Sequence, residues 1–228
     1  MEASMTPKHS SLTIAIVGGH GQIALRTTAL LTAAGHRVLS VIRNPDQAAE
    51  IERAGGEPVV VDIERATDGD LAAAVAEADT LLFAAGAGPG SGPARKETVD
   101  YQGALTTMAA AARLGARVVQ ISYIGVANTP PAGTSPDFLA YQLAKHRADL
   151  ALQASGLDWL IVRPGTLTND PESGRVETGA LERGPVSRAN VARVLAEVLL
   201  RPDLNGFAFD LLDGDTPVAD AVAALAQH

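Results

Sequence analysis

The 228-residue sequence contains no cysteine, which excludes disulfides, thiolate metal ligands and thiol catalysis. It has no long hydrophobic run: the apolar stretch after the polar residues 1–11 covers only residues 12–17, too short for a signal-peptide core or a membrane-spanning helix. It also lacks a cluster of basic residues, and 18 Lys and Arg against 26 Asp and Glu give a net charge of −8. Nucleic acids and anionic membranes attract basic surfaces. We therefore expect neither as a partner, and we expect a cytoplasmic protein.

Apolar, β-branched runs alternate regularly with alanine-rich segments along the chain. Runs such as residues 12–17 and 116–121 are apolar on both faces, which is typical of parallel strands covered by helices on each side. The alternation predicts one α/β domain over residues 12–228, with a Rossmann-type, doubly wound parallel sheet of about seven strands and a small C-terminal region on the substrate side. Residues 1–11 are expected to form a poorly ordered tail.

The expected strands are Leu12–Val17, Arg37–Ile42, Glu57–Asp62, Thr80–Ala84, Ala116–Ile121, Asp158–Val162 and Phe207–Leu212. The expected helices are Gln22–Ala34, Pro45–Ala54, Asp70–Ala78, Glu97–Leu114, Asp137–Ser155, Arg188–Leu200 and Pro217–Gln227. Three longer segments, residues 85–94, 123–136 and 163–185, leave the carboxyl ends of strands, where ligands bind in open α/β sheets. We expect residues 123–136 and 163–185 to be the loops that select the substrate.

A glycine-rich loop follows the first expected strand, with the spacing Gly18-x-x-Gly21-x-x-Ala24. Small residues at these positions allow a tight turn and a close approach to a pyrophosphate, which then faces the free N–H groups of the following helix. This placement predicts a dinucleotide site, although the same spacing also occurs in a purely structural turn. Gly19 and His20 complete the loop and are counted among the expected cofactor contacts, with His20 on the loop surface.

The end of the second expected strand selects between NAD and NADP. NAD-binding folds place a carboxylate there, about 20 residues past the glycine loop, where it binds the ribose 2′-hydroxyl. This chain has Arg43 and Asn44 at that point and no carboxylate. A guanidinium pairs well with a phosphate, so Arg43 favours NADP(H) over NAD(H). The alternative is a surface arginine at the end of a strand.

Tyr141 and Lys145 lie four residues apart in an expected helix, which places both on one helical face. A tyrosine has an ordinary pKa near 10, and an ammonium about 4 Å away would lower it by roughly three units at an effective dielectric of about 20. Such a tyrosine can exchange a proton with a carbonyl oxygen. Ser122, at the end of the fifth strand, can orient that carbonyl. These three residues are the predicted catalytic set; the alternatives are a solvent-facing Tyr/Lys pair and a serine that caps a turn.

With these residues in place, the chain resembles the short-chain dehydrogenase/reductase superfamily, and in particular its atypical branch of NAD(P)-binding, NmrA-like and epimerase-like proteins. The resemblance covers nearly the whole chain, from IAIVGGHGQIA (residues 14–24) to FDLLDGDTPVADAV (residues 209–222). The motifs between them are VIRNPDQ, VVVDI, LLFAAGAG, VDYQGA, VVQISYIGV, YQLAKHRAD, SGLDWLIVRPGTLT and VSRANVARVLAEVL.

The resemblance implies a role for individual residues along a bound cofactor. At the adenosine end, Arg43 would contact the 2′-phosphate, and Asp62 and Ile63 would lie beside the adenine. The pyrophosphate would be held by Gly18, Gly21, Gln22 and Ile23, and the riboses would lie beside Ala84, Ala85 and Gly86. At the other end, Lys145 would contact the nicotinamide ribose, and Pro164 and Gly165 would lie over the nicotinamide. Ser122, Tyr141 and Lys145 would be the catalytic residues.

Three features depart from the family pattern. Tyr123 follows Ser122 where many relatives have a second serine, Asp100 replaces a common asparagine, and the C-terminal region is shorter than in sugar-nucleotide epimerases. These differences favour an NADP(H)-dependent oxidoreductase that reduces a small carbonyl or conjugated substrate. Two alternatives stay open: a non-catalytic NADP(H)-binding redox sensor, and an epimerase or dehydratase that oxidises its substrate transiently.

No metal is expected, because the histidines lack ligand spacing. The expected partner is a small-molecule substrate, and the oligomeric state is open between a monomer and a homodimer.

Overall fold

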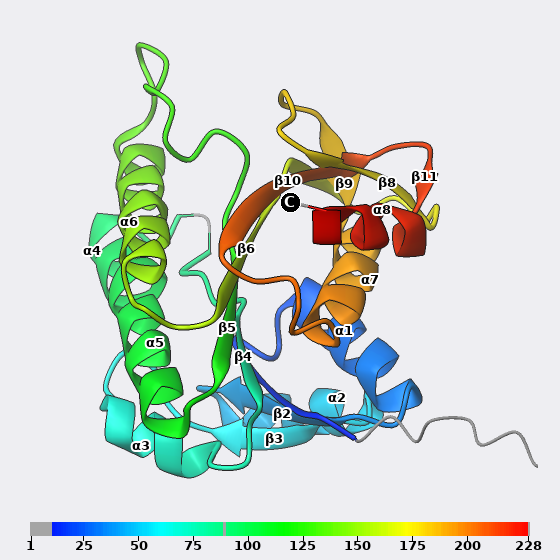
Figure 1. Cartoon of the computed structure of the whole chain (residues 1–228). Helices are drawn as coiled ribbons and strands as arrows, with labels where there is room; N and C mark the ends of the chain where they lie inside the picture. The colour runs from blue at the N-terminus through cyan, green and yellow to red at the C-terminus, as the bar shows by residue number, and fades with distance from the viewer. Residues whose placement is uncertain (1–10, 89, 228) are drawn as a thin grey trace, which may run out of the picture.

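The computed structural model describes residues 11–88 and 90–227. A nine-stranded sheet in the order β11-β8-β10-β6-β5-β4-β1-β2-β3 runs through the molecule (Figure 1). The seven expected strands are all present, each within two residues of its expected ends, and all pair in parallel. Their bounds are β1 Thr13–Val17, β2 Arg37–Ile42, β3 Glu57–Val60, β4 Thr80–Phe83, β5 Arg117–Ile121, β6 Trp159–Pro164 and β10 Phe207–Asp213. The predicted α/β, Rossmann-type class is confirmed.

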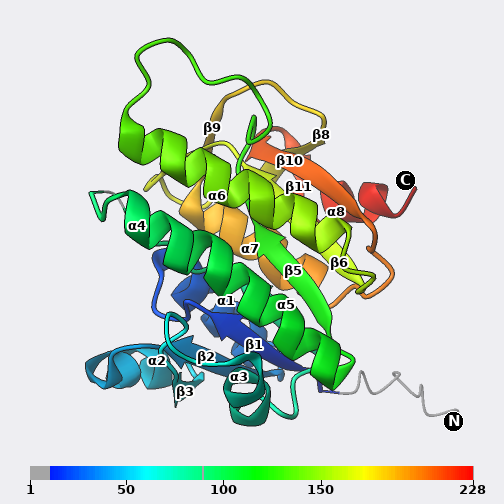
Figure 2. The ribbon, with the colours of Figure 1, turned by 90° about the vertical axis from the view of Figure 1, so that its left-hand side faces the viewer.

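Helices cover both faces of the sheet. The bounds of the main helices are α1 Gln22–Ala33, α2 Ala48–Arg53, α3 Asp68–Ala74, α5 Gly103–Leu114, α6 Pro136–Gln153, α7 Arg188–Leu199 and α8 Val218–Ala224, with short 3₁₀ turns at Pro45–Gln47 and Leu225–Gln227. Figure 2 shows α5 and α6 across one face, with α7 and α1 behind the sheet. On β1, Ile14 and Ile16 join the core under α7, whereas Ala15 and Val17 join the core under α5. This alternation explains why the strand is apolar on both faces from Ile14 to Val17.

Four short strands were missed because the segments that contain them are polar and rich in turns. β7 Thr166–Thr168 and β9 Pro185–Ser187 pair with each other. β8 Arg175–Gly179 extends the main sheet antiparallel to β10, and β11 Thr216–Pro217 pairs antiparallel with β8 at the edge. The segment 163–185, expected to be a loop, therefore contains β7, β8 and the start of β9. In the other expected loop, residues 123–135 contain no helix or strand, and Pro136 is the first residue of α6.

The expected helix 97–114 is also different in detail. A helical turn α4 at Pro93–Arg95 leads into a π-helical stretch at Lys96–Gln102, and regular α-helix begins only at Gly103. π-Helical turns are rare and concentrate at functional sites. The expected tail, residues 1–11, lies outside the described residues except for Ser11, whose hydroxyl donates to the carbonyl of Gly35 at 2.9 Å.

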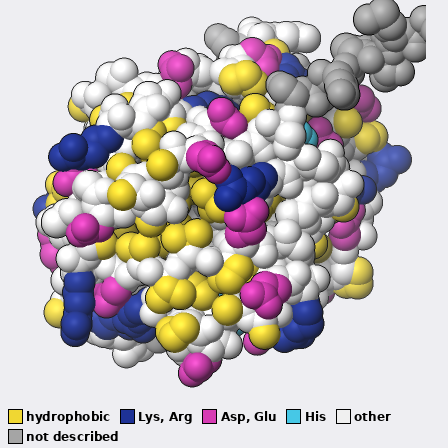
Figure 3. All heavy atoms as spheres, turned by 90° about the horizontal axis from the view of Figure 1, so that it is seen from below, with side chains coloured by type: hydrophobic (Ala, Val, Ile, Leu, Met, Phe, Trp, Pro, Cys, Tyr) yellow, Lys and Arg dark blue, Asp and Glu magenta, His cyan; other side chains and the backbone are white. Residues whose placement is uncertain are grey.

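Charges of both signs are interspersed on the face that Figure 3 shows, with hydrophobic side chains between them. Ion pairs among the described residues include Arg37 with Glu57 at 2.8 Å and Arg113 with Asp68. That face therefore does not carry a broad field of one sign. Among the described residues, no helix is long and apolar enough to cross a membrane.

The glycine loop lies where β1, β2 and β4 end together. Gly18 has a φ of +87°, and its N–H donates to the carbonyl of Val41 on β2 at 3.2 Å. A Cβ on Gly18 would lie 2.6 Å from the Cα of Ala85, beyond the end of β4. Position 18 therefore requires glycine, because its backbone is left-handed and because the backbone of Ala85 leaves no room for a side chain.

We predict that Gly18→Ala destabilises the protein more than Gly35→Ala. Gly35 has nearly the same φ, +88°, but no atom within 4 Å of its potential Cβ. Gly35→Ala should cost about 1–2 kcal/mol of left-handed strain, whereas Gly18→Ala adds an overpacking cost of about 1–3 kcal/mol. Urea unfolding measures both, and equal losses would contradict the proposed packing.

Candidate functional site

Two adjacent cavities open along the carboxyl edge of the sheet. The larger has a volume of about 690 Å³ and lies between the end of β5, helix α6 and the segment around β7. The smaller, about 300 Å³, lies over the ends of β2 and β3. Gly21, Ala84, Ala85 and Gly86 line both, so one elongated ligand can extend across this shared wall from one cavity into the other.

Helix α1 begins at this shared wall without a cap. Its N-cap residue, Gly21, has no side chain to accept a hydrogen bond, and its first turn carries no acidic residue. In contrast, Ser135 caps α6 and Ser187 caps α7. The first N–H groups of α1 have no hydrogen-bond partner among the residues that the structure describes. Such groups, at the positive end of the helix dipole, fit a pyrophosphate.

Nearly all sequence-predicted site residues line one cavity or both. Those in the larger cavity are Gly21, Gln22, Ile23, Ala84, Ala85, Gly86, Ser122, Tyr141, Lys145, Pro164 and Gly165. Those in the smaller cavity are Gly18, His20, Gly21, Arg43, Asp62, Ile63, Ala84, Ala85 and Gly86. Gly19 lines neither: a Cβ there would lie 2.6 Å from Cβ of Ser40, so this glycine permits contact with β2.

His20 and Glu50 face each other at the rim of the smaller cavity. The imidazole Nε2 lies 3.2 Å from a carboxylate oxygen of Glu50 on α2, without hydrogen-bond geometry. His20 thus contributes to the wall of the smaller cavity, and it lies apart from the Tyr141 hydroxyl in the larger one.

Two guanidinium groups converge on one carboxylate in the smaller cavity. Glu64 accepts from Arg43 at 2.9 Å, from Arg95 at 2.7 Å and from the hydroxyl of Thr98 at 2.6 Å. The hydrogen bond from Arg95 is the main cause that lowers the pKa of Glu64. Arg43 therefore lies at the cavity where it was expected, but it shares the site with an ionised carboxylate and a second arginine that the sequence did not indicate.

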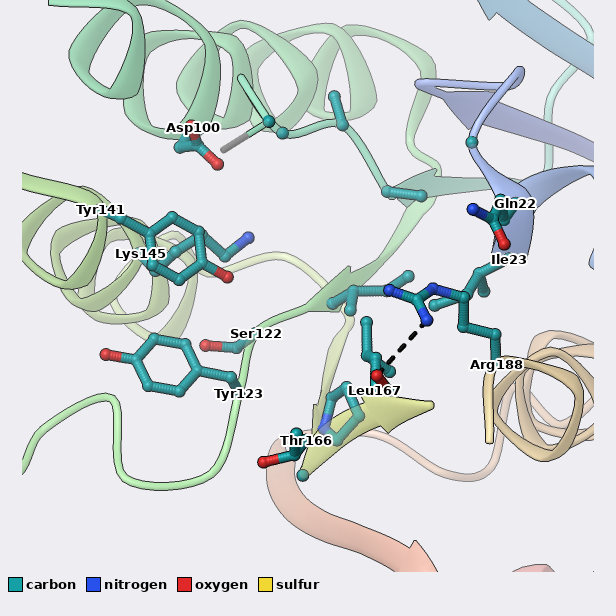
Figure 4. A pocket seen from close by; sticks show the side chains of 18 of the residues that line it. Gln22, Ile23, Asp100, Ser122, Tyr123, Tyr141, Lys145, Thr166, Leu167 and Arg188 are labelled. Atoms are coloured by element: carbon teal, nitrogen blue, oxygen red, sulfur yellow. Dashed lines mark hydrogen bonds between the residues drawn. The ribbon is translucent and has the colours of Figure 1, made fainter. Parts of the chain in front are cut away.

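The predicted catalytic residues meet in the larger cavity. Figure 4 shows Tyr141 and Lys145 from α6 beside Ser122 and Tyr123 from the end of β5, with Gln22, Ile23 and Arg188 across the pocket. The Tyr141 ring stacks on the Tyr123 ring, with centroids 5.4 Å apart. The four-residue spacing on α6 thus places both predicted side chains in one cavity.

The predicted lowering of the Tyr141 pKa by Lys145 is wrong for this structure. Burial raises the pKa of Tyr141 well above its ordinary value, and the nearby carboxyl groups of Asp100 and Asp149 raise it further. The Lys145 ammonium lies over the ring of Phe83, 5.2 Å from its centroid. Burial also lowers the pKa of Lys145, against the opposing effect of the same two carboxyl groups.

A buried carboxylate that the sequence analysis missed holds Ser122. Asp149 is 1% exposed and accepts from Gln120 at 2.7 Å, from the Ser122 hydroxyl at 2.9 Å and from Arg163 at 3.1 Å. The single proton of Ser122 is therefore directed at Asp149, so its oxygen offers only lone pairs to the cavity. The expected role of Ser122 in the cavity therefore changes from hydrogen-bond donor to hydrogen-bond acceptor.

A signal for Asp149 does exist in the sequence. It follows Tyr141 and Lys145 by one more four-residue step, and Gln120 is a polar residue inside an apolar strand. Both features point to a polar contact between α6 and β5, but only the fold brings Arg163 to it from β6.

Asp100 lies in the π-helical stretch and fixes the loop after β4. It is 1% exposed and accepts from the backbone N–H of Ala87 at 3.1 Å. Burial raises its pKa, while Lys145 and Lys96 oppose that rise. The replacement of the family's asparagine thus keeps a hydrogen-bond acceptor for the loop and adds a titratable group to the cavity wall.

Two arginines of the larger cavity were also missed. Arg188, the first residue of α7, donates to the carbonyl of Thr168 at 3.1 Å and to the side chain of Asn169 at 2.9 Å. Arg183 lies between β8 and β9. No local sequence pattern marks either residue, because their place at the site depends on the strands that were not predicted. Among the described residues, no group of three or more His, Cys, Asp or Glu side chains could hold a metal ion.

The chain is similar in sequence and structure to several known proteins. A family model for NAD(P)H-binding domains matches residues 18–202. YhfK of Bacillus subtilis (strain 168), described as an uncharacterized sugar epimerase, is 35% identical over 213 residues, which cover 92% of this chain and 98% of YhfK. A structure from Bacillus halodurans, named as a candidate NAD-dependent epimerase/dehydratase, is 31% identical with a TM-score of 0.86, over 94% of this chain and 100% of that one.

A more distant structure supports the fold alone. It is a short-chain dehydrogenase/reductase from Veillonella parvula DSM 2008 in complex with NADP, 21% identical with a TM-score of 0.70, over 90% of this chain and 96% of that chain.

The parallel sheet, the uncapped α1 and the paired cavities define a Rossmann-type dinucleotide-binding protein. The matched family is more specific: this chain belongs to the NAD(P)H-binding family, and its structural neighbours are epimerase/dehydratase-like proteins and reductases of the atypical short-chain type. The resemblance seen in the sequence is confirmed.

We predict that Asp149→Ala lowers the free energy of unfolding by about 3–5 kcal/mol, because it removes one partner of a buried ion pair. The matched control is Glu172→Ala, which breaks a 2.8 Å pair with Arg193 between half-exposed side chains and should cost no more than about 1 kcal/mol. Chemical denaturation compares the two variants. Similar losses would show that the Asp149 network is not a stabilising centre.

Proposed function

We propose that the protein is an NADP(H)-dependent oxidoreductase that reduces a small carbonyl or conjugated substrate. The observation that carries this proposal is the shared position of Ser122, Tyr141 and Lys145 in one cavity, which joins the uncapped N-terminus of α1. The family match supports the cofactor class.

The residues of the two cavities fit such a cofactor along its length. The N–H groups of Gln22 and Ile23 and the guanidinium of Arg188 suit the pyrophosphate. Arg43 and Arg95 suit a 2′-phosphate, which would compete with the carboxylate of Glu64 for them. The complex of a more distant structural neighbour with NADP is in keeping with this choice.

When bound, the nicotinamide supplies or removes a hydride at the substrate carbon. Tyr141 donates a proton to the substrate oxygen, because its raised pKa keeps the hydroxyl protonated at neutral pH. Ser122, whose own proton points at Asp149, accepts a hydrogen bond from a hydroxyl in the cavity. Lys145, whose pKa is lowered by burial against the opposing effect of Asp149 and Asp100, would bind the ribose of the nicotinamide.

Tyr141 carries its proton at neutral pH, because burial and the nearby carboxyl groups raise its pKa. The protonated hydroxyl is the form that carbonyl reduction uses, whereas oxidation of a hydroxyl uses the ionised form, which is scarce. An epimerase or dehydratase that oxidises its substrate transiently needs the ionised tyrosine as a base in its first step. The names of YhfK and the Bacillus halodurans structure favour an epimerase or dehydratase, which would leave the total amount of reduced cofactor unchanged over many turnovers.

We predict that Tyr141→Phe lowers kcat for NADPH-dependent reduction by about 100- to 10,000-fold, the range for loss of a general acid. The Kd of NADPH should stay within about twofold, because the hydroxyl acts on the substrate. Tyr101→Phe is the control, since Tyr101 packs under Arg147 outside both cavities. NADPH oxidation across a panel of aldehydes, ketones, enones and quinones is the assay. Unchanged turnover in Tyr141→Phe would show that Tyr141 is not the proton donor.

The cofactor preference has a separate test. Arg43→Ala and Arg95→Ala should each weaken NADPH binding by about 10- to 100-fold, the effect of losing a hydrogen bond between charged groups. NADH binding should stay nearly constant. Arg65→Ala serves as the control, because Arg65 is exposed, pairs with Asp62 and lines neither cavity. Fluorescence titration measures each Kd. Equal affinity of the wild type for NADH and NADPH would contradict the proposed preference.

A further inference from the structure

Arg183 differs from every other arginine of the chain. Each of the others forms a hydrogen bond or an ion pair with a carboxylate, an amide oxygen or a backbone carbonyl. Within residues 11–88 and 90–227, the Arg183 guanidinium has no such partner, although it lines the larger cavity. A planar group with five N–H donors at a cavity wall is therefore available to a ligand.

The fold places this guanidinium at the substrate end of the cavity. It lies against Gly125, where a Cβ would be 3.4 Å from one guanidinium nitrogen. Gly125 belongs to the loop after β5, and Arg183 belongs to the turn between β8 and β9. Arg188, in contrast, lies across the pocket beside Gln22 and Ile23, at the proposed pyrophosphate position (Figure 4).

A second donor without a partner lies nearby. The hydroxyl of Tyr123 is buried and forms no hydrogen bond among the described residues. Burial raises the pKa of Tyr123 to about 12, the charge of Arg183 opposes that rise, and both residues line the larger cavity. Tyr123 therefore stays protonated and can donate to an acceptor beside Arg183. Its ring, with those of Phe138 and Tyr141, forms an aromatic wall.

The charges of the cavity also favour an anion. Lys145, Arg183 and Arg188 line it, against the single carboxyl group of Asp100. Asp149 lies behind Ser122 and is paired with Arg163. Lys145 and Arg188 are assigned to the cofactor. Of the positively charged residues that line the described part of the cavity, Arg183 then remains to bind the substrate.

We propose that the substrate carries a carboxylate, which binds to the guanidinium of Arg183 and the hydroxyl of Tyr123, while its apolar body packs on the aromatic wall. This inference rests on the proposed function, because it concerns the substrate end of the same cavity. It names the substrate class as a carboxylate-bearing aromatic or unsaturated carbonyl compound.

The test compares two substrates of nearly equal shape, 4-carboxybenzaldehyde and its methyl ester, in NADPH oxidation. The wild type should prefer the acid. Arg183→Ala should raise KM for the acid by about 10- to 100-fold, the effect of a charged hydrogen bond, and leave the ester within about twofold. Tyr123→Phe should give a smaller loss for the acid alone. Arg193→Ala, on an exposed arginine of α7 outside the cavity, is the control and should change neither.

A binding measurement separates this inference from the proposed function. In saturating NADPH, calorimetry with 4-(hydroxymethyl)benzoate and its methyl ester measures binding without turnover, because the reduced cofactor cannot accept a hydride from the alcohol. Tighter binding of the anion, lost in Arg183→Ala, would support the site even if no carbonyl were reduced. Reduction of neutral carbonyls with no preference for the acid would overturn the inference and leave the oxidoreductase intact. Equal binding of both probes, binding of neither, or unchanged selectivity in Arg183→Ala would also overturn it.

Discussion

The contact between the backbone of Gly18 and that of Ala85 is the constraint on which the site depends. It brings the ends of β1 and β4 within van der Waals distance and leaves no room for a side chain. The N–H groups of Gly18 and Gly19 both donate to the carbonyl of Val41, so β2 is fixed to the same turn. Helix α1 then begins at Gln22, after its N-cap Gly21, with its first N–H groups at the wall shared by the two cavities.

Starting from that turn, the residues of the candidate site follow one another along the carboxyl edge of the sheet. Arg43, Glu64 and Arg95 form a charged cluster over β2 and β3. The N-terminus of α1 lies in the middle, and β5 and α6 supply the proposed catalytic side chains beyond it. Parallel strands explain this order, because the seven parallel strands of the sheet all end at the same edge. The buried carboxylate of Asp149 then joins β5, β6 and α6 behind Ser122.

The sequence was sufficient for the seven parallel strands, because each contains an apolar run, and the central strands are buried on both faces. It was also sufficient for the pair Tyr141 and Lys145, since one helix fixes their spacing. It was insufficient for β7, β8, β9 and β11, which are short and polar and owe their pairing to tertiary contacts. Arg183 and Arg188 reach the cavity only through those strands. The environment of Tyr141 was mispredicted for a related reason: spacing along a helix says nothing about burial by Tyr123 or about the carboxyl groups nearby.

The central claim is that one NADP(H) molecule lies across both cavities over the glycine turn. A crystal structure of the protein grown with NADPH tests it most directly. The account predicts the pyrophosphate at the N–H groups of Gln22 and Ile23, the adenosine over β2 and β3, and the nicotinamide beside Tyr141 and Lys145. A cofactor bound elsewhere, or a pyrophosphate away from the start of α1, would contradict it.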